Sequence, residues 1–189
     1  MNASSARHWL ARLTLAVAIL FVGRQMTCAQ ENISTEYKFK AVFMFHFAQF
    51  VDWPTNAFSS AQSPLVIGVL GDDPFDDFLD ATVHGENVNG HPLVVERYHD
   101  LASVKDCQIL FISASEESQL GRVLAGLKGK TILTVSDIDS FPENGGIIGF
   151  ATIQNKIHFR INTDAARDAG LTFSSKLLRL ADIVTPKAK

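Results

Sequence analysis

The stretch PLVIGVLGDDPFDDFLDATV, residues 64–83, decides the fold class. Its first part, residues 64–71, is apolar on both alternating faces, a pattern typical of a strand that is covered on two sides. The pair Asp73-Pro74 that follows suits the start of a helix, because aspartate caps a first turn and proline fits the first helical position. The stretch therefore predicts a buried strand followed by a helix.

The same alternation continues along the chain. Further strands are predicted at PLVVERY, CQILFIS and KTILTVSD (92–98, 107–113 and 130–137), and a helix at EESQLGRVLAGL (116–127). Short strands that are apolar on both faces and separated by helices indicate a mostly parallel sheet with helices on both sides. We therefore predict a Rossmann-like α/β fold.

The C-terminal part breaks this alternation. GGIIGFATI (145–153) and KIHFRIN (156–162) are separated only by Gln154 and Asn155, too few residues for a crossover, so they predict an antiparallel hairpin. One face of this hairpin is predicted to join the core. The other is predicted to point outward and to hold Ile147, Ile153, Lys156, His158 and Arg160. Such a half-apolar, half-basic face suits an interface, but a solvated face or a second core layer has the same pattern.

Closing helices are predicted at 163–169 and 174–184, and residues 185–189 are predicted to be a tail. Another helix is predicted within FKAVFMFHFAQFVDWP (39–54), where phenylalanines recur at helical spacing and Pro54 prevents continuation. Its polar side chains would be costly in lipid, so this helix is predicted to be buried on most sides against the sheet.

Residues 1–29 predict a cleaved signal peptide. They begin with basic residues, continue with the apolar run 13–23, and end with the small-x-small pattern Thr27-Cys28-Ala29. The apolar run is too short for a membrane span, which needs roughly 20 residues; an uncleaved amphipathic anchor is the alternative. The expected product is an exported, periplasmic protein with a single domain over residues 30–184.

The composition is that of an ordinary globular domain, with 47% apolar and 20% charged residues. Cleavage after Ala29 would remove three arginines and no acid, which leaves 14 basic against 20 acidic residues and a net charge of −6. An acidic chain of this kind is a poor binder of nucleic acids. Only Cys107 would remain, so no intramolecular disulfide is possible, and we interpret it as a buried apolar residue and not as a reactive thiol.

Candidate chemistry lies where the predicted strands end, because parallel strands bring their carboxyl ends to one edge of the sheet. Asp72, Ser113 and Asp137 could form a ligand-binding site there. The same residue types also cap turns and helices, and we favour that interpretation. No phosphate loop, nucleophile elbow or pair of histidines at metal-ligand spacing is present in the sequence. We therefore predict neither a metal, nor a cofactor, nor an enzyme.

The assembled segments resemble the YfiR family of exported bacterial proteins. The matching segments run from Tyr37 to Val184 and are YKFKAVFMFHFAQFVDWP, PLVIGVLGDDPF, VNGHPLVV, CQILFIS, TILTVSDIDSF, GGIIGF, KIHFRIN and GLTFSSKLLRLADIV. The resemblance implies a non-enzymatic periplasmic regulator that can dimerise. Its relatives bind the periplasmic part of a membrane-embedded diguanylate cyclase and hold it inactive until an envelope or redox signal arrives, and related domains are sensor inputs of histidine kinases.

By position, the resemblance implies that Ile147, His158 and Arg160 contact the partner. The chain departs from the family in two ways: redox-responsive relatives carry several cysteines where this chain keeps only Cys107, and an acid often stands where Arg160 does. Our leading hypothesis is an inhibitor of a membrane-bound diguanylate cyclase that controls cyclic di-GMP. The alternative is a periplasmic small-ligand sensor that feeds a histidine kinase or another envelope system, and a metal-dependent hydrolase using the same acids is less favoured.

Overall fold

The structure is a computed structural model that describes residues 35–154 and 156–185. The compact unit from Tyr37 to Lys189 holds the sheet and its covering helices. The predicted signal peptide over residues 1–29 and most of the predicted tail, residues 186–189, lie outside the described residues. None of the helices in the described ranges has both the length and the apolar character needed to cross a bilayer.

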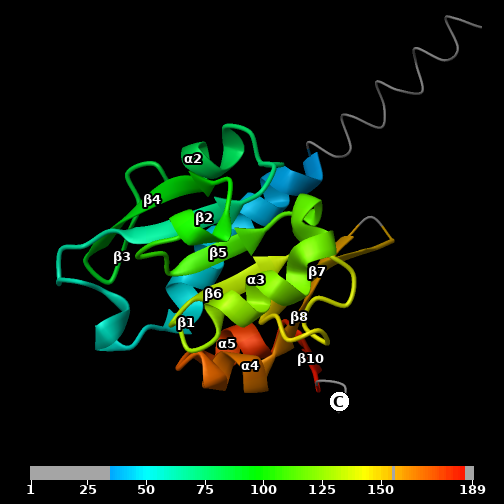
Figure 1. The fold of residues 1–189 in the computed structure, drawn as a ribbon. Helices are drawn as coiled ribbons and strands as arrows, with labels where there is room; N and C mark the ends of the chain where they lie inside the picture. Colours follow the sequence, from blue (N-terminus) through cyan, green and yellow to red (C-terminus); the bar gives the residue numbers. More distant parts are fainter. Residues whose placement is uncertain (1–34, 155, 186–189) are drawn as a thin grey trace, which may run out of the picture. The chain divides into compact units, whose positions relative to one another are not determined.

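Eight strands of the described residues form one sheet, in the order β10-β8-β7-β6-β5-β2-β4-β3 (Figure 1). They are β2 (Leu65–Leu70), β3 (Asn87–Val88), β4 (His91–Tyr98), β5 (Ile109–Ile112), β6 (Leu133–Ser136), β7 (Ile148–Ile153), β8 (Lys156–Asn162) and β10 (Asp182–Val184). Strands β4, β2, β5, β6 and β7 are parallel, β3 and β8 are antiparallel to their neighbours, and β10 is parallel to β8. The chain therefore has an α/β fold with a mixed sheet of mostly parallel strands.

Helices pack on both faces of this sheet and enclose two cores. In β2, Leu65, Ile67 and Val69 point into the first core, whereas Val66 and Leu70 point into the second. The first core is covered by the helix over residues 35–50, α2 (Phe78–Val83), α4 (Thr163–Asp168) and α5 (Ser175–Leu178), and the second by α3 (Leu120–Leu127). Figure 1 shows α3 in front of the sheet and the blue helix behind it.

Short elements complete the unit. They are the 3₁₀ turns η1 (Thr55–Ala57), η2 (Leu101–Ser103) and η3 (Ala114–Gln119), and the strands β1 (Val51–Asp52) and β9 (Thr172–Phe173), which pair antiparallel. The turn η3 leads directly into α3, so the predicted helix over 116–127 is split into a 3₁₀ start and an α-helical end.

The structure shows which side of the helix over residues 35–50 is buried. Ala41, Met44 and Ala48 are fully buried, whereas Phe39 is 58% exposed, although it belongs to the phenylalanine spacing that predicted a mostly buried helix. Small side chains at 41 and 48 allow the helix to approach the sheet closely, and the bulky Phe43 then packs beside this contact line. The helix also ends earlier than predicted, at residue 50, because residues 51–52 pair with β9.

The last predicted helix, residues 174–184, is wrong beyond α5. The α-helix ends at Leu178, and Asp182–Val184 form β10, which pairs with β8 from Arg160 to Asn162. The β-branched pair at 183 and 184 fits a strand better than a helix, and the edge of the sheet supplies hydrogen bonds for an extended segment. The apolar residues whose spacing predicted one long helix lie partly in α5 and partly in this edge strand.

Candidate functional site

At the carboxyl edge of the sheet, the predicted residues Asp72 and Ser113 lie in adjoining loops. The Ser113 hydroxyl accepts a hydrogen bond from the Ser115 N–H at 3.4 Å, and the Ser115 hydroxyl accepts one from the Asp72 N–H at 3.0 Å. Ser113 caps η3 and is buried, whereas Asp72 is exposed. Ser113 therefore has the capping role that we favoured from the sequence, and Ser115 links the two strand-to-helix connections.

Asp137, the third predicted residue of this edge, forms a buried ion pair with a lysine that the sequence did not single out. The Lys40 Nζ lies 2.6 Å from Asp137 Oδ2, and the Tyr37 hydroxyl donates to the same oxygen at 2.7 Å. The side chains of Lys40 and Asp137 are only 3% and 11% exposed. Asp137 Oδ1 is buried and accepts no hydrogen bond. Asp137 therefore bonds to the helix over residues 35–50, while Asp72 and Ser113 bond to Ser115.

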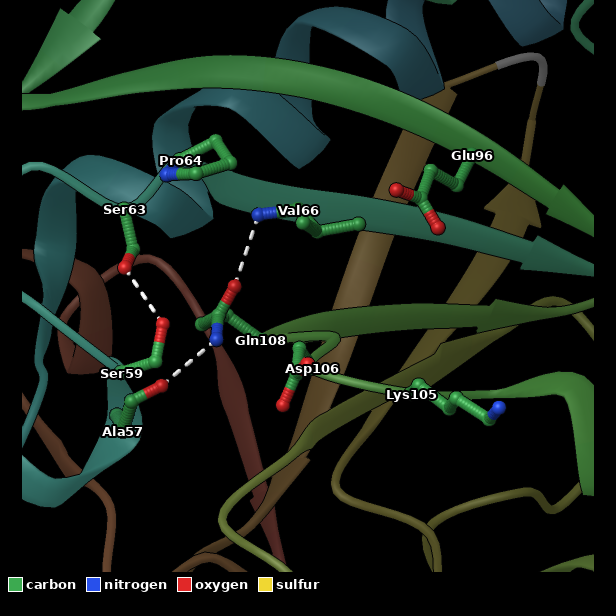
Figure 2. Close-up of a pocket in the computed structure, with 9 residues that line it drawn as sticks. All are labelled: Ala57, Ser59, Ser63, Pro64, Val66, Glu96, Lys105, Asp106 and Gln108. Carbon is green, nitrogen blue, oxygen red and sulfur yellow. Dashed lines mark hydrogen bonds between the residues drawn. The ribbon is translucent and has the colours of Figure 1, made fainter.

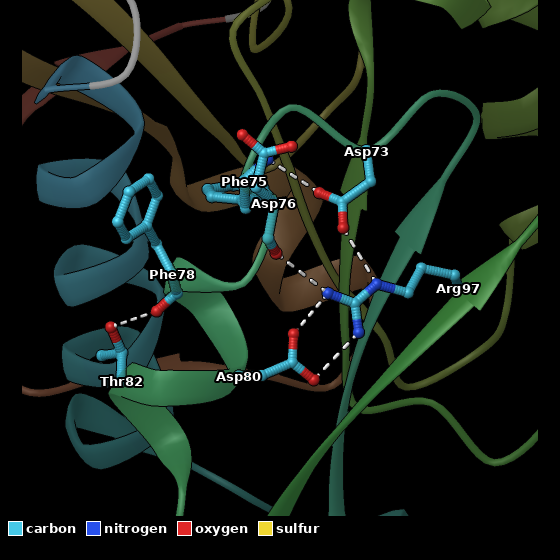
Figure 3. A network of polar contacts seen from close by, with 7 residues as sticks. All are labelled: Asp73, Phe75, Asp76, Phe78, Asp80, Thr82 and Arg97. Carbon is cyan, nitrogen blue, oxygen red and sulfur yellow. Dashed lines mark hydrogen bonds and ion pairs between the residues drawn. The ribbon is translucent and has the colours of Figure 1, made fainter.

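Asp73 was predicted to cap a helix, and it caps a turn instead. Its Oδ1 accepts the Phe75 N–H at 2.8 Å, but the first helix after it, α2, begins only at Phe78. Its Oδ2 accepts from Arg97 Nε at 2.9 Å, and Arg97 also pairs with both carboxylate oxygens of Asp80 and donates to the Asp76 carbonyl (Figure 3). The guanidinium thus links β4 to the connection that follows β2.

The hydrogen bonds of this network shift the pKa values of Asp80 and Arg97. Hydrogen bonding to Arg97 lowers the pKa of Asp80 below its ordinary value, against the opposing effect of burial. Hydrogen bonding to Asp80 is also the largest cause that raises the pKa of Arg97. Because the side chains of Arg97 and Asp80 are 35% and 49% exposed, water screens much of this interaction.

Cys107 is a buried thiol, as predicted. It is 4% exposed, and its Sγ lies 2.9 Å from the Ile109 carbonyl oxygen. Burial raises the pKa of Cys107 to about 12, so the reactive thiolate is scarce at neutral pH. The ring of Tyr98 lies over the same region, since a methyl group added at Gly68 would meet both the ring and the Cys107 sulfur.

The pairing of β7 with β8 defines a second candidate site. Ala151 lies opposite His158, Gly149 opposite Arg160 and Ile153 opposite Lys156, so these residues share the face of the strands that points away from the first core. On this face Ile153 is 51% exposed, and Lys156 and His158 are also exposed. We call Lys156, His158 and Arg160 the basic row.

Ile147 and Arg160, both predicted to point outward on this face, are less exposed than that prediction implies. Ile147 is 3% exposed and belongs to the first core, so its predicted outward position is wrong. It precedes β7 and does not continue the alternation of the strand. Arg160 does lie on this face, but it forms an ion pair with Glu143 in which the side chains are 30% and 16% exposed. Arg160 Nε and Glu143 Oε2 are buried and lack hydrogen-bond partners.

A polar cavity of about 310 Å³ opens at the opposite, amino edge of the sheet (Figure 2). Its lining residues are Ala57, Ser59, Ser63, Pro64, Val66, Glu96, Lys105, Asp106 and Gln108. Gln108 closes its floor, because its side chain accepts the Val66 N–H at 2.8 Å and donates to the Ala57 carbonyl at 2.7 Å. This cavity was not predicted, because its lining residues come from segments far apart along the chain.

Within residues 35–154 and 156–185, no group of three or more His, Cys, Asp or Glu side chains is arranged to hold a metal ion. The fold and these sites define an α/β domain with a mixed sheet, a closed carboxyl edge and an exposed apolar and basic face. Residues 37–182 match the model of the YfiR/HmsC-like family (DUF4154), and the chain belongs to that family. It is a regulatory and not a catalytic family, it is periplasmic, and it is known in cyclic di-GMP regulation. No curated protein matches the chain.

Proposed function

We propose that this protein is a non-enzymatic periplasmic regulator that binds and inhibits a membrane-bound diguanylate cyclase and thereby controls cyclic di-GMP. Family membership over residues 37–182 supports the regulatory role. The observation that carries the binding role is the exposure of Ile153, Lys156 and His158 together on one face of β7 and β8. An apolar side chain among basic ones suits a surface that a partner covers.

In this proposal, His158 and Arg160 contact the partner, and the exposed Ile153 takes the position predicted for the buried Ile147. Arg160 has a fixed orientation because Glu143 holds it. Its guanidinium therefore loses little side-chain entropy when a partner binds, and an acidic group on the partner would compensate the basic row.

Export accompanies the binding role. We infer that residues 1–29 are removed and that residues 30–184 act as one domain in the periplasm. Intact mass measurement of the protein purified from the periplasm of its native host tests this inference, and a chain that begins at Gln30 is the expected result. A chain that retains Met1 would contradict cleavage.

Affinity copurification from the native host tests the partner. The tagged protein is isolated from solubilised envelopes, both unstressed and under oxidising or envelope stress, and membrane proteins are identified by mass spectrometry. We expect a protein with a periplasmic segment and a cytoplasmic cyclase domain, released under at least one stress. If no membrane signalling protein is captured under any condition, the proposal is wrong.

A periplasmic small-ligand sensor that feeds a histidine kinase is the second candidate, and the cavity in Figure 2 favours it. Its volume of about 310 Å³ is at the lower end of that of ligand pockets, roughly 300–1,000 Å³. Its lining combines Lys105 with Glu96 and Asp106, a charge pattern that suits a zwitterionic ligand. Asp72, Ser113 and Asp137 at the carboxyl edge form the alternative place for a ligand.

A thermal-shift screen with metabolites and peptidoglycan fragments tests this candidate, because a bound ligand stabilises the folded state by mass action. If the cavity binds the ligand, Lys105→Met removes the shift and the pair Asp72→Asn with Asp137→Asn keeps it. The reverse result assigns the ligand to the carboxyl edge, and no shift with any compound speaks against the sensor function.

A further inference from the structure

The outer edge of β8 is only half covered. On one side β7 pairs with β8 from Lys156 to Ile161, whereas on the other side β10 pairs only with Arg160, Ile161 and Asn162. No other strand in the part of the chain that the structure describes pairs with residues 156–159 on this side. Figure 1 shows β8 and β10 together at this end of the sheet.

An uncovered strand edge is a template for another strand, because its outward N–H and C=O groups lack partners. Within residues 35–154 and 156–185, the chain does not supply that strand itself. β10 starts at Asp182 beside Arg160 and runs away from Lys156, and the residues before it form the end of α5 and a turn, with Leu180 73% exposed. Residues 156–159 therefore remain available to a segment from another molecule.

The two faces of this edge differ in chemistry. The basic row lies on one face, and Ile157 and Phe159 lie on the other. Phe159 packs against Phe43 with ring centroids 5.5 Å apart, and Phe39, one helical turn before Phe43, is 58% exposed. An added strand would place its side chains alternately on these two faces, so acidic and apolar residues in alternation would complement them.

The chain shows this complementarity in its own edge strand. In β10, Asp182 pairs with Arg160, so its carboxylate extends the face of the basic row, and the next residue, Ile183, pairs with Ile161 of the first core. The acid-then-apolar order of β10 is the order that the uncovered half of β8 would favour in a partner.

We propose that residues 156–159 of β8 bind an extended segment of the partner protein by strand addition, and that this segment alternates acidic with apolar side chains. The inference rests on the proposed function, because it specifies how the regulator would hold its membrane-bound partner. Backbone hydrogen bonds between β8 and the partner segment would provide the affinity. The basic row would favour the register that places the acidic side chains of the segment on its own face.

A second copy of the chain fits this edge poorly. If two β8 strands paired antiparallel about His158, Lys156 of one copy would lie opposite Arg160 of the other. If they paired about Ile157, Lys156 would lie opposite His158. Like charges directly opposite each other destabilise a strand pair, so the basic row discourages self-pairing and admits an acidic strand.

The test titrates the exported form of the full chain with the peptide Glu-Val-Glu-Val-Glu, whose termini are acetylated and amidated. Binding is measured by the shifts of the protein's amide NMR signals and by amide hydrogen exchange. We expect saturable shifts and slower exchange at residues 156–159, weakened by high salt because the charges are exposed. The combined variant Lys156→Glu with His158→Glu should bind this peptide about tenfold more weakly and prefer the Lys-Val-Lys-Val-Lys peptide. The matched control, Arg122→Glu on α3 with Lys128→Glu directly after this helix, changes two exposed residues and should bind like the unmodified protein.

No change at residues 156–159 with the acidic peptide, or equal binding of both peptides, overturns strand addition. Copurification separates this inference from the proposed function. If the unmodified protein captures a membrane signalling protein and the Lys156→Glu, His158→Glu variant captures as much, strand addition is wrong and the regulatory function stands. If the peptide protects residues 156–159 but no membrane signalling protein is captured, strand addition is supported and the proposed function fails.

Discussion

Lys40 and Asp137 form an ion pair that joins the helix over residues 35–50 to the carboxyl end of β6, with Nζ 2.6 Å from Oδ2. The ammonium also lies 4.3 Å from the ring centroid of Tyr37, which donates its hydroxyl to the same carboxylate oxygen. This lysine therefore links the helix to the edge of the sheet where ligands commonly bind in open α/β folds.

Lys40→Met should destabilise the protein by about 3 to 5 kcal/mol, because it leaves the buried Asp137 carboxylate without its cation. The double variant Lys40→Met with Asp137→Leu should recover most of this loss, since replacing both partners of a buried pair with apolar residues is often close to neutral. Urea unfolding followed by circular dichroism measures both. Lys130→Met, at an exposed position, is the control and should stay within about 0.5 kcal/mol.

Phe47→Ala should cost about 3 to 5 kcal/mol of unfolding free energy, because it removes a fully buried ring. Phe47 packs against Phe150 and Phe159 with centroid distances of 5.7 and 5.3 Å. Phe39→Ala, on the same helix but 58% exposed, should change stability by less than about 1 kcal/mol. Equal losses in the two variants would contradict the exposed position of Phe39 on this helix.

The difference between these two phenylalanines shows what the sequence could and could not establish. Apolar spacing predicted that the segment is a helix against a sheet, and both hold. Because Phe, Met and Ala occur all around this helix, the spacing did not determine which side is buried. The decisive interaction, Lys40 with Asp137, joins residues separated by 97 positions, and no local pattern contains it.

The candidate sites also depend on contacts that no local sequence pattern contains. The strands β2, β5 and β6 lie within the predicted segments, and β4 begins one residue before its segment, because each is a short run rich in apolar residues between turn signals. Strand alternation placed His158 and Arg160 on one face but misplaced Ile147, which precedes β7 and turns into the core. The ion pair of Arg160 with Glu143 and the cavity near Gln108 depend on loop conformation, for which the sequence offers no periodic signal.

Acid should weaken the contribution of Asp80 to stability. Arg97 lowers the folded-state pKa of Asp80, so its contribution is complete above its unfolded pKa, near 4, and is lost as the pH falls through the lower folded value. The stability difference between the unmodified protein and Asp80→Asn should therefore be constant from about pH 7 to 5 and shrink below about pH 4. Because Asp80 is 49% exposed, the difference should be under about 1 kcal/mol.

Urea titrations at several pH values measure this dependence. Asp168→Asn, at an exposed position on α4, is the control for the loss of a surface carboxylate elsewhere in the protein. A stability difference for Asp80→Asn that grows as the pH falls would contradict the role of Arg97.

Cys107 should resist thiol reagents in the folded protein. Its side chain is buried and its pKa is raised to about 12, so at pH 8 a maleimide or disulfide reagent should label it only when the protein unfolds. Labelling followed by mass spectrometry should show little modification in buffer and complete modification in urea. Rapid labelling without denaturant would show that the second core opens near β5 and would reopen a redox role for this residue.

Intracellular cyclic di-GMP in the native host, with and without this gene, tests the central claim most directly. We predict that deletion raises cyclic di-GMP and that expression of the unmodified protein restores the original level. The Lys156→Glu, His158→Glu variant should restore it less well than the Arg122→Glu, Lys128→Glu control. An unchanged level on deletion, under both resting and envelope-stress conditions, would contradict inhibition of a diguanylate cyclase.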